Sequence, residues 1–118
     1  MALDTVRLLE LVNQLSSDDA AARGKSADAV ADLTGDFSIF QVHLLGAVLC
    51  TTASAETELA HRERQLRALR RLADTGHIIG PTLKMLNELD TANLSPAEHE
   101  YVAYFRAEYA FENFPSTP

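Results

Sequence analysis

Apolar residues recur every three to four positions along almost the entire chain, and no segment alternates apolar and polar residues as a half-buried strand would. The spacing predicts an all-α protein with six helices. Their expected ranges are residues 3–15, 18–33, 37–52, 55–74, 81–90 and 96–113. The third helix is apolar on nearly every side, from Ile39 and Phe40 to Leu49, so we expect it in the middle of the fold. The leucines of the fourth helix that we expect to face inward are Leu59, Leu66, Leu69 and Leu72.

Capping residues mark several helix ends. Ser95-Pro96-Ala97-Glu98 has the sequence of a capping box with proline at the first helical position, which predicts the start of the sixth helix. Gly35 and Gly76 follow the second and fourth helices, where glycine is the usual terminator. Because the connections are short, we expect the six helices to form three antiparallel hairpins.

A weak internal repeat supports the hairpin arrangement. Residues 27–33 and 66–72 share an apolar pattern at an offset of 39 residues, and each segment is followed closely by Thr-Gly. This period is typical of HEAT-type helix pairs, so the hairpins would form either a short HEAT-like stack or a compact bundle. We expect a single helical domain over residues 1–114 and a frayed tail over residues 115–118.

The charge is unevenly distributed. The chain contains ten Lys and Arg and seventeen Asp and Glu, which gives a net charge of −7. This charge disfavours nucleic acid and anionic membranes as partners and favours a basic protein. Residues 1–60 hold nine acids and three bases, residues 61–85 six bases and two acids, and residues 86–118 six acids and one base. This pattern is compatible with a partner surface or with charge compensation between packed helices. With a single cysteine, no long apolar run and no signal-like N-terminus, the sequence predicts a soluble cytoplasmic protein.

Gly24-Lys25-Ser26 matches the end of a phosphate-binding loop, but the context of that motif is missing. The loop needs a glycine five places earlier and a preceding strand, whereas position 19 is Asp and the flanking sequence is helical. The small residues here instead recur at spacings of four, three and four. They are Ala20, Gly24, Ala27 and Ala31, and they predict a helix face that a second helix approaches closely.

The histidines and the cysteine do not form a recognisable catalytic or metal-binding pattern. Glu58 and His61 have the Glu-x-x-His spacing of di-iron bundles but lack a second copy, so we expect His61 to be a surface residue. His43 and Cys50 could share a helix face, yet no orienting acid or oxyanion pocket accompanies them. We therefore expect no catalytic residue, no metal and no cofactor.

The basic run over residues 61–71 contains no aromatic residue that could stack on bases, which disfavours nucleic-acid binding. A solvated helix face with ion pairs one turn apart is the better interpretation. The expected pairs are Glu58/Arg62, Glu63/Arg67 and Arg70/Asp74.

The sixth helix and its continuation contain all three tyrosines and three of the five phenylalanines. Tyr101, Val102, Phe105 and Tyr109 form one expected inward arc. Glu100, Tyr104, Glu108 and Phe111 form a neighbouring arc that mixes aromatic and acidic side chains. Such a mixture is typical of a binding site for a basic protein, and the alternative is that Tyr104 and Phe111 widen the core face.

Three segments resemble small helical immunity proteins of bacterial polymorphic toxin systems. They are residues 66–77 (LRALRRLADTGH), residues 86–90 (LNELD) and residues 94–102 (LSPAEHEYV). The resemblance covers about half of the chain and implies a cytoplasmic protein that binds a cognate toxin and blocks its active site or its substrate channel. It carries over no catalytic residues. The acidic charge of the chain favours a basic toxin domain, such as a nuclease, as that partner.

Two other function classes remain open at this point. The first is a helical-repeat adaptor or regulator that binds a peptide or a subunit in a groove. The second is a small metal or thiol enzyme, which would need a bound metal or a strongly perturbed Cys50.

Overall fold

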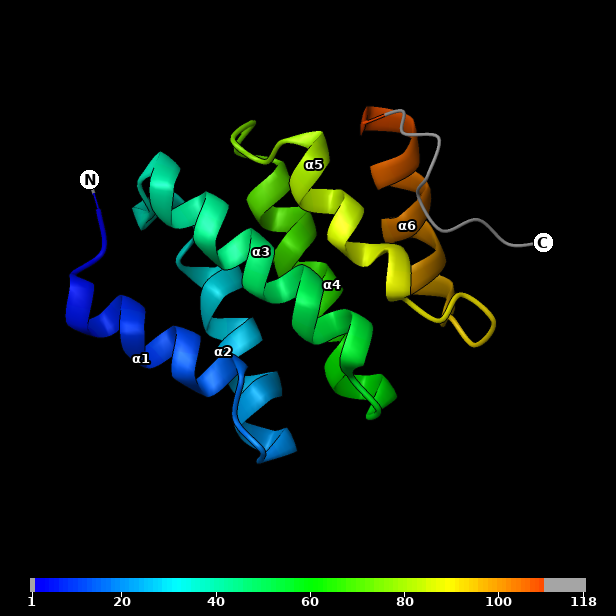
Figure 1. The fold of residues 1–118 in the computed structure, drawn as a ribbon, viewed down its shortest axis with the longest axis horizontal. Helices are drawn as coiled ribbons and strands as arrows, with labels where there is room; N and C mark the ends of the chain where they lie inside the picture. The colour runs from blue at the N-terminus through cyan, green and yellow to red at the C-terminus, as the bar shows by residue number, and fades with distance from the viewer. Residues whose placement is uncertain (1, 110–118) are drawn as a thin grey trace.

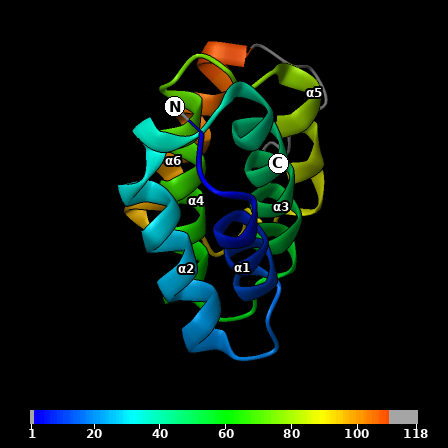
Figure 2. The same ribbon diagram turned by 90° about the vertical axis from the view of Figure 1, so that its left-hand side faces the viewer.

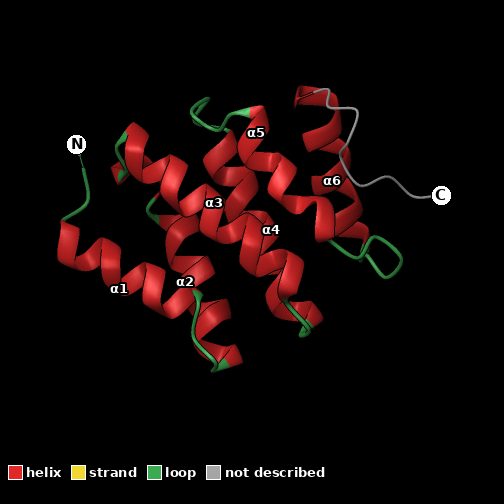
Figure 3. Cartoon of the chain, in the orientation of Figure 1, coloured by secondary structure: helices red, strands yellow, loops and turns green. Residues whose placement is uncertain are grey.

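The computed structural model describes residues 2–109, and within that range it confirms the all-α prediction with six helices and no strand (Figure 3). The helices are α1 (Thr5–Leu15), α2 (Ala20–Asp32), α3 (Ile39–Ala55), α4 (Leu59–Ala73), α5 (Gly80–Leu83) and α6 (Pro96–Tyr109). Two 3-10 helices, η1 (Thr34–Asp36) and η2 (Lys84–Glu88), complete the pattern. The expected tail at residues 115–118 and the expected end of the sixth helix at residue 113 lie outside the described residues.

The helices form two layers. One layer contains α1, α3 and α5 with η2, and the other contains α2, α4 and α6 (Figure 2). Helices within a layer run in roughly the same direction, opposite to those of the other layer (Figure 1). The shortest dimension of 19 Å corresponds to two packed helices, each about 10 Å across. The chain therefore forms three antiparallel pairs that are stacked in sequence order.

One hydrophobic core lies between the two layers. Its completely buried large side chains are Leu11, Leu15, Leu45, Leu49, Leu66, Leu69, Leu72, Leu83, Leu86 and Phe105. These large side chains come from every helix except α2. The core residues of α2 are smaller and include Ala27, Val30 and Ala31. The small side chains on α2 allow its close packing on α4, as the spacing of small residues predicts.

The fifth helix differs from the prediction, because only Gly80–Leu83 is α-helical and Lys84–Glu88 is 3-10. Three leucines spaced exactly three residues apart explain the difference. With three residues per turn, a 3-10 helix turns Leu83, Leu86 and Leu89 toward the same side, and all three are buried.

The turn between α3 and α4 lies a few residues later than predicted. Thr51 and Ser54 donate their hydroxyl hydrogens to the carbonyls four residues earlier, Ala47 and Cys50, and so remain within α3. The helix ends at Ala55, and α4 begins at Leu59. Leu59 is consequently in the first turn of α4 and 54% exposed, so its predicted inward position is wrong.

Candidate protein-binding surfaces

The start of α6 is fixed by the predicted capping box. The backbone N–H of Glu98 donates to Ser95 Oγ (3.2 Å), and the N–H of Ser95 donates to Glu98 Oε1 (2.9 Å). Val102 and Phe105 are buried against the rest of the fold, which turns the opposite side of the helix to solvent. Glu100 and Glu108, two residues of the expected arc, are exposed.

Tyr104 lies between these two glutamates, one turn from each, and is half-buried. The Arg70 guanidinium of α4 covers one face of its ring, with Cζ 3.5 Å from the ring centroid. The Tyr104 hydroxyl donates to Asp74 Oδ1 (3.3 Å), and the ring meets Phe105 edge-on with centroids 5.8 Å apart. Burial and the nearby Asp74 carboxylate raise the pKa of Tyr104. The Tyr104 ring is therefore held in one orientation. Phe111, the other aromatic residue of the predicted arc, lies outside the described residues.

The basic run of α4 is largely neutralised within the fold. Arg62 is buried and makes two hydrogen bonds to Glu98 of α6, at 2.7 and 3.0 Å, and a third to the Asn93 carbonyl. Arg64 and Arg67 face Asp28 of α2 at 3.6 and 3.8 Å. These cations compensate acids on neighbouring helices, which is one of the two interpretations that the sequence left open.

Only one of the three predicted ion pairs within α4 is present among the described residues. Arg70 and Asp74 are 3.2 Å apart as expected. The Glu58/Arg62 and Glu63/Arg67 pairings are wrong, because Arg62 turns inward to Glu98 and Glu63 accepts a hydrogen bond from the Ser95 hydroxyl.

A second surface, which sequence reasoning missed, lies on the outer side of α3. This helix is apolar all round, but only one of its sides is buried, and Phe40 at its start is 70% exposed. Along its second half, three adjoining hollows of about 400, 230 and 450 Å³ share Thr51 in their walls. We call these three hollows together the α3 groove. Its walls are formed by Leu15, Ser16, Arg23, Ala47, Val48, Thr51, Thr52, Ser54, Ala55, Glu56 and Met85.

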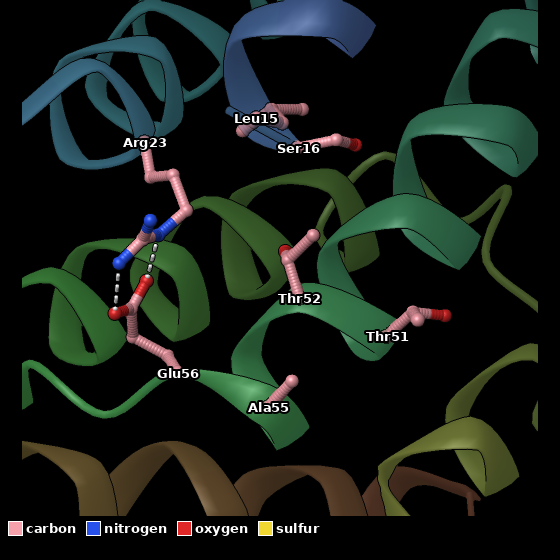
Figure 4. Close-up of a pocket in the computed structure, with 7 residues that line it drawn as sticks. All are labelled: Leu15, Ser16, Arg23, Thr51, Thr52, Ala55 and Glu56. Atoms are coloured by element: carbon pink, nitrogen blue, oxygen red, sulfur yellow. Dashed lines mark hydrogen bonds and ion pairs between the residues drawn. The ribbon is translucent and has the colours of Figure 1, made fainter. Parts of the chain in front are cut away.

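The α3 groove is bounded at one end by an ion pair (Figure 4). Arg23 of α2 donates from Nε and Nη2 to the two carboxylate oxygens of Glu56, at 2.7 and 2.8 Å. Gln65 Nε2 and the backbone N–H of Glu58 also donate to Glu56. The bonds from Arg23, which outweigh burial, lower the pKa of Glu56 to about 2. The sequence signal for this groove is the cluster of Ser and Thr at positions 51, 52 and 54 in an otherwise apolar helix.

The thiol and imidazole groups do not assemble into a reactive centre in the part of the chain that the structure describes. Cys50 is completely buried, and this burial raises the pKa of its thiol to about 12, so it is protonated at neutral pH. His61 is half-buried with its Nδ1 against Gly24 of α2, which corrects the expected surface position. Within residues 2–109, no group of three or more His, Cys, Asp or Glu side chains is placed to hold a metal ion.

Comparisons with known proteins do not indicate a family or a function for this chain. No protein-family model matches the chain, and neither the curated proteins nor the solved structures give a match. Among the described residues, no helix is both long and apolar enough to cross a membrane.

Proposed function

We propose that this protein is an immunity protein, which binds the toxin domain of a bacterial polymorphic toxin in the cytoplasm and occludes its active site without catalysing a reaction. The observation that carries the proposal is the arrangement on α6, where Glu100 and Glu108 are exposed one turn on either side of the fixed Tyr104 ring. The resemblance of residues 66–77, 86–90 and 94–102 to such immunity proteins points in the same direction.

The physical chemistry of the α6 surface suits a basic partner. A tyrosine that is already held in place loses little conformational freedom on binding, and tyrosine is among the side chains that dominate binding energy at interfaces. The exposed carboxylates can meet Lys or Arg side chains of the partner, and the net charge of −7 accelerates encounter with a cationic domain. A nuclease toxin would have such a cationic surface, because it binds a polyanion.

The first test measures binding to the C-terminal domain of a polymorphic toxin encoded next to this protein. Tyr104→Ala should weaken the complex by about 30-fold or more, as loss of a central aromatic contact does. Glu100→Gln/Glu108→Gln should slow association several-fold at low salt and have little effect at high salt. Isothermal titration calorimetry gives the affinities, stopped-flow fluorescence gives the association rates, and inhibition of the toxin's activity gives the functional readout.

Asp32→Asn is the matched control, because Asp32 is exposed on α2 in the same layer but at the other end of the stack. It removes one negative charge and should leave the affinity within about twofold. If the α6 variants melt at the wild-type temperature and still bind and inhibit the toxin as the wild type does, the proposed α6 interface is wrong. If the intact protein fails to bind the adjacent toxin domain, the immunity function itself is refuted.

A further inference from the structure

The layer of α1, α3 and α5 has an apolar outer face, which the proposed inhibitory function of α6 does not use. Six of the seven large apolar side chains that are exposed among the described residues belong to this layer. They are Val6, Leu9, Ile39, Phe40, Ile79 and Met85. The central helix of the layer, α3, contains no Asp, Glu, Lys or Arg in its 17 residues. Such an uncharged, apolar surface is typical of a face that another protein covers.

The exposed side of α3 has a regular pattern of large and small side chains. Phe40, Leu44, Ala47 and Thr51 follow one another at spacings of four, three and four. They therefore form a single stripe on the side of the helix opposite to the buried Leu49. Phe40 and Thr51 are exposed, and Leu44 and Ala47 are half-buried. This spacing is the one by which two helices pack side by side, and here the first two side chains are large and the last two are small.

The order of sizes in the α3 stripe matches a second copy that runs in the opposite direction. In a two-fold pair of antiparallel α3 helices centred between residues 45 and 46, Phe40 of one copy faces Thr51 of the other, and Leu44 faces Ala47. Each large side chain then meets a small one. A parallel pair would instead place Phe40 against Phe40 and Thr51 against Thr51, which packs poorly at both ends.

The α3 groove provides space for the Phe40 ring. Phe40 is 70% exposed at the start of α3, and the groove lies beside Thr51, about 16 Å further along the helix. Two of its hollows measure about 230 and 450 Å³ and share Thr51 and Met85. A cavity of about 150 Å³ accommodates a benzene ring. The hydroxyls of Thr51 and Ser54 already donate to carbonyls of their own helix, so an apolar side chain in the groove leaves neither of them unpaired.

Charge and size also favour a second copy as the occupant. Two chains that each have a net charge of −7 repel one another. The repulsion is least when they meet through a face that contributes no charge to the contact, and the α3 stripe is such a face. The molecule measures 42 × 29 Å when it is viewed down its shortest axis, as in Figure 1. This face has room for the ~800 Å² that each partner contributes to a stable interface.

We propose that the outer face of α3 is the interface of a homodimer, in which two α3 helices pack antiparallel about a two-fold axis and each Phe40 enters the α3 groove of the other copy. Burial of the two Phe40 rings and of the Leu44–Ala47 contacts supplies most of the stabilisation. The α6 surfaces belong to the opposite layer and remain accessible on the two outer sides of the dimer (Figure 2). The dimer can therefore present two α6 surfaces at once.

Sedimentation equilibrium of the full chain tests the homodimer. We expect the wild type to show a concentration-dependent equilibrium between monomer and dimer. Phe40→Glu places a carboxylate against the apolar groove, and Thr51→Arg fills the groove with a long cationic side chain. Each variant alone should weaken the dimer by about tenfold or more. Because both positions are exposed in the monomer, both variants should melt close to the wild-type temperature.

A mixture of the two variants tests the antiparallel orientation. The heterodimer of Phe40→Glu with Thr51→Arg has one native contact of Phe40 with Thr51, and one contact in which the introduced carboxylate meets the introduced guanidinium. An equimolar mixture should therefore associate about tenfold more tightly than either variant alone. A parallel pair would not bring the two substituted positions together and would show no such recovery. A fluorescent label on one variant identifies the heterodimer in the ultracentrifuge.

Ala21→Glu and Ala107→Arg are the matched controls for the added charges. They introduce the same charges at exposed positions of α2 and α6, in the opposite layer. Each should leave the dissociation constant of the dimer within about twofold. Tyr104→Ala should also leave the dimer unchanged, so failure of the homodimer and failure of the α6 interface give different results.

Three outcomes would overturn the homodimer. Wild-type protein that stays monomeric up to about 1 mM would exclude it and leave the apolar face to a different protein. A dimer that persists in both Phe40→Glu and Thr51→Arg would have its interface elsewhere. A mixture that associates no more tightly than the separate variants would contradict the antiparallel pairing.

Discussion

At the scale of single residues, Glu56 joins more elements than any other described carboxylate. It follows α3, accepts two hydrogen bonds from Arg23 of α2 and one from Gln65 of α4, and also bonds the backbone of Glu58. Its side chain is buried, so the four bonds replace the water that ionisation requires. Glu56 is thus an ionised cross-link between the first two helix pairs.

The low pKa of Glu56 predicts a defined loss of stability in acid. Its pKa is about 2 in the folded protein against 4.5 for an unperturbed carboxyl group, so the unfolded chain binds this proton first. The stabilisation of the folded protein by the ionised Glu56 is complete above pH 4.5 and is lost as the pH falls from 4.5 toward 2. Glu56→Gln should therefore be less stable than the wild type by about 1–3 kcal/mol at pH 7, and the difference should shrink through this window.

Urea unfolding at several pH values between 7 and 2 checks the Glu56 prediction. Glu10→Gln is the control, because Glu10 is exposed on α1 and pairs only with the exposed Arg7 among the described residues. Its stability difference from the wild type should stay within about 0.5 kcal/mol throughout. A Glu56→Gln difference that is independent of pH would contradict the role assigned to the ionised carboxylate.

At the scale of helices, the contact between α2 and α4 depends on the absence of a side chain at Gly24. A Cβ built at this position collides with the His61 ring of α4 and approaches Arg64 Nη1 to 2.9 Å. Gly24 is fully helical, so its role is close packing and not an unusual backbone angle. The apparent phosphate-loop sequence is therefore a helix-packing position.

Gly24→Ala should destabilise the protein by about 1–3 kcal/mol, although alanine is favoured over glycine by about 1 kcal/mol within a helix. The clash with His61 outweighs that preference because the ring is confined between two helices. His61→Ala in the Gly24→Ala background should recover most of the loss, since it removes the atoms that the new methyl group meets. The measurement is a double-mutant cycle of unfolding free energies.

Gly35→Ala serves as the control for the helix contact. Among the described residues, no atom beyond its chain neighbours lies within 4 Å of a Cβ built there, so its effect should be within about 0.5 kcal/mol. Additive effects of Gly24→Ala and His61→Ala would mean that the two positions are not coupled through this contact.

Local sequence rules predicted those features of the fold that depend on residues close together in the chain. The capping box at Ser95 and the small-residue face of α2 are such features, and both are confirmed. Arg62 shows where local rules fail, because its partner Glu98 is 36 residues away and the nearer Glu58 was the expected one. The α3 groove was missed for a related reason, since a helix that is apolar all round predicts full burial, and the number of covering helices is a property of the whole fold.

At the scale of the whole molecule, the three helix pairs are held in a row, and each pair contacts mainly its neighbours in the stack. The third pair reaches the second through η2 on α3 and α6 on α4. The α4–α6 contact contains the buried Arg62–Glu98 ion pair, whose side chains are 4% and 0% exposed. Because stacked helix pairs are stabilised by nearest-neighbour interfaces, we expect this ion pair to contribute to the coupling of the third pair to the rest.

Arg62→Met should lower the free energy of unfolding by about 3–5 kcal/mol, because it leaves the buried Glu98 without its counter-ion. The loss should be localised: hydrogen exchange should accelerate most at amides of α6, such as Val102 and Phe105, and least at amides of α2, such as Val30. Arg71→Met removes the same charge from an exposed site on α4 and should stay within about 0.5 kcal/mol of the wild type. Hydrogen exchange followed by mass spectrometry distinguishes this outcome from an equal loss of protection in α2 and α6. An equal loss would mean that the six helices unfold as one cooperative unit and that the stack has no separable third pair.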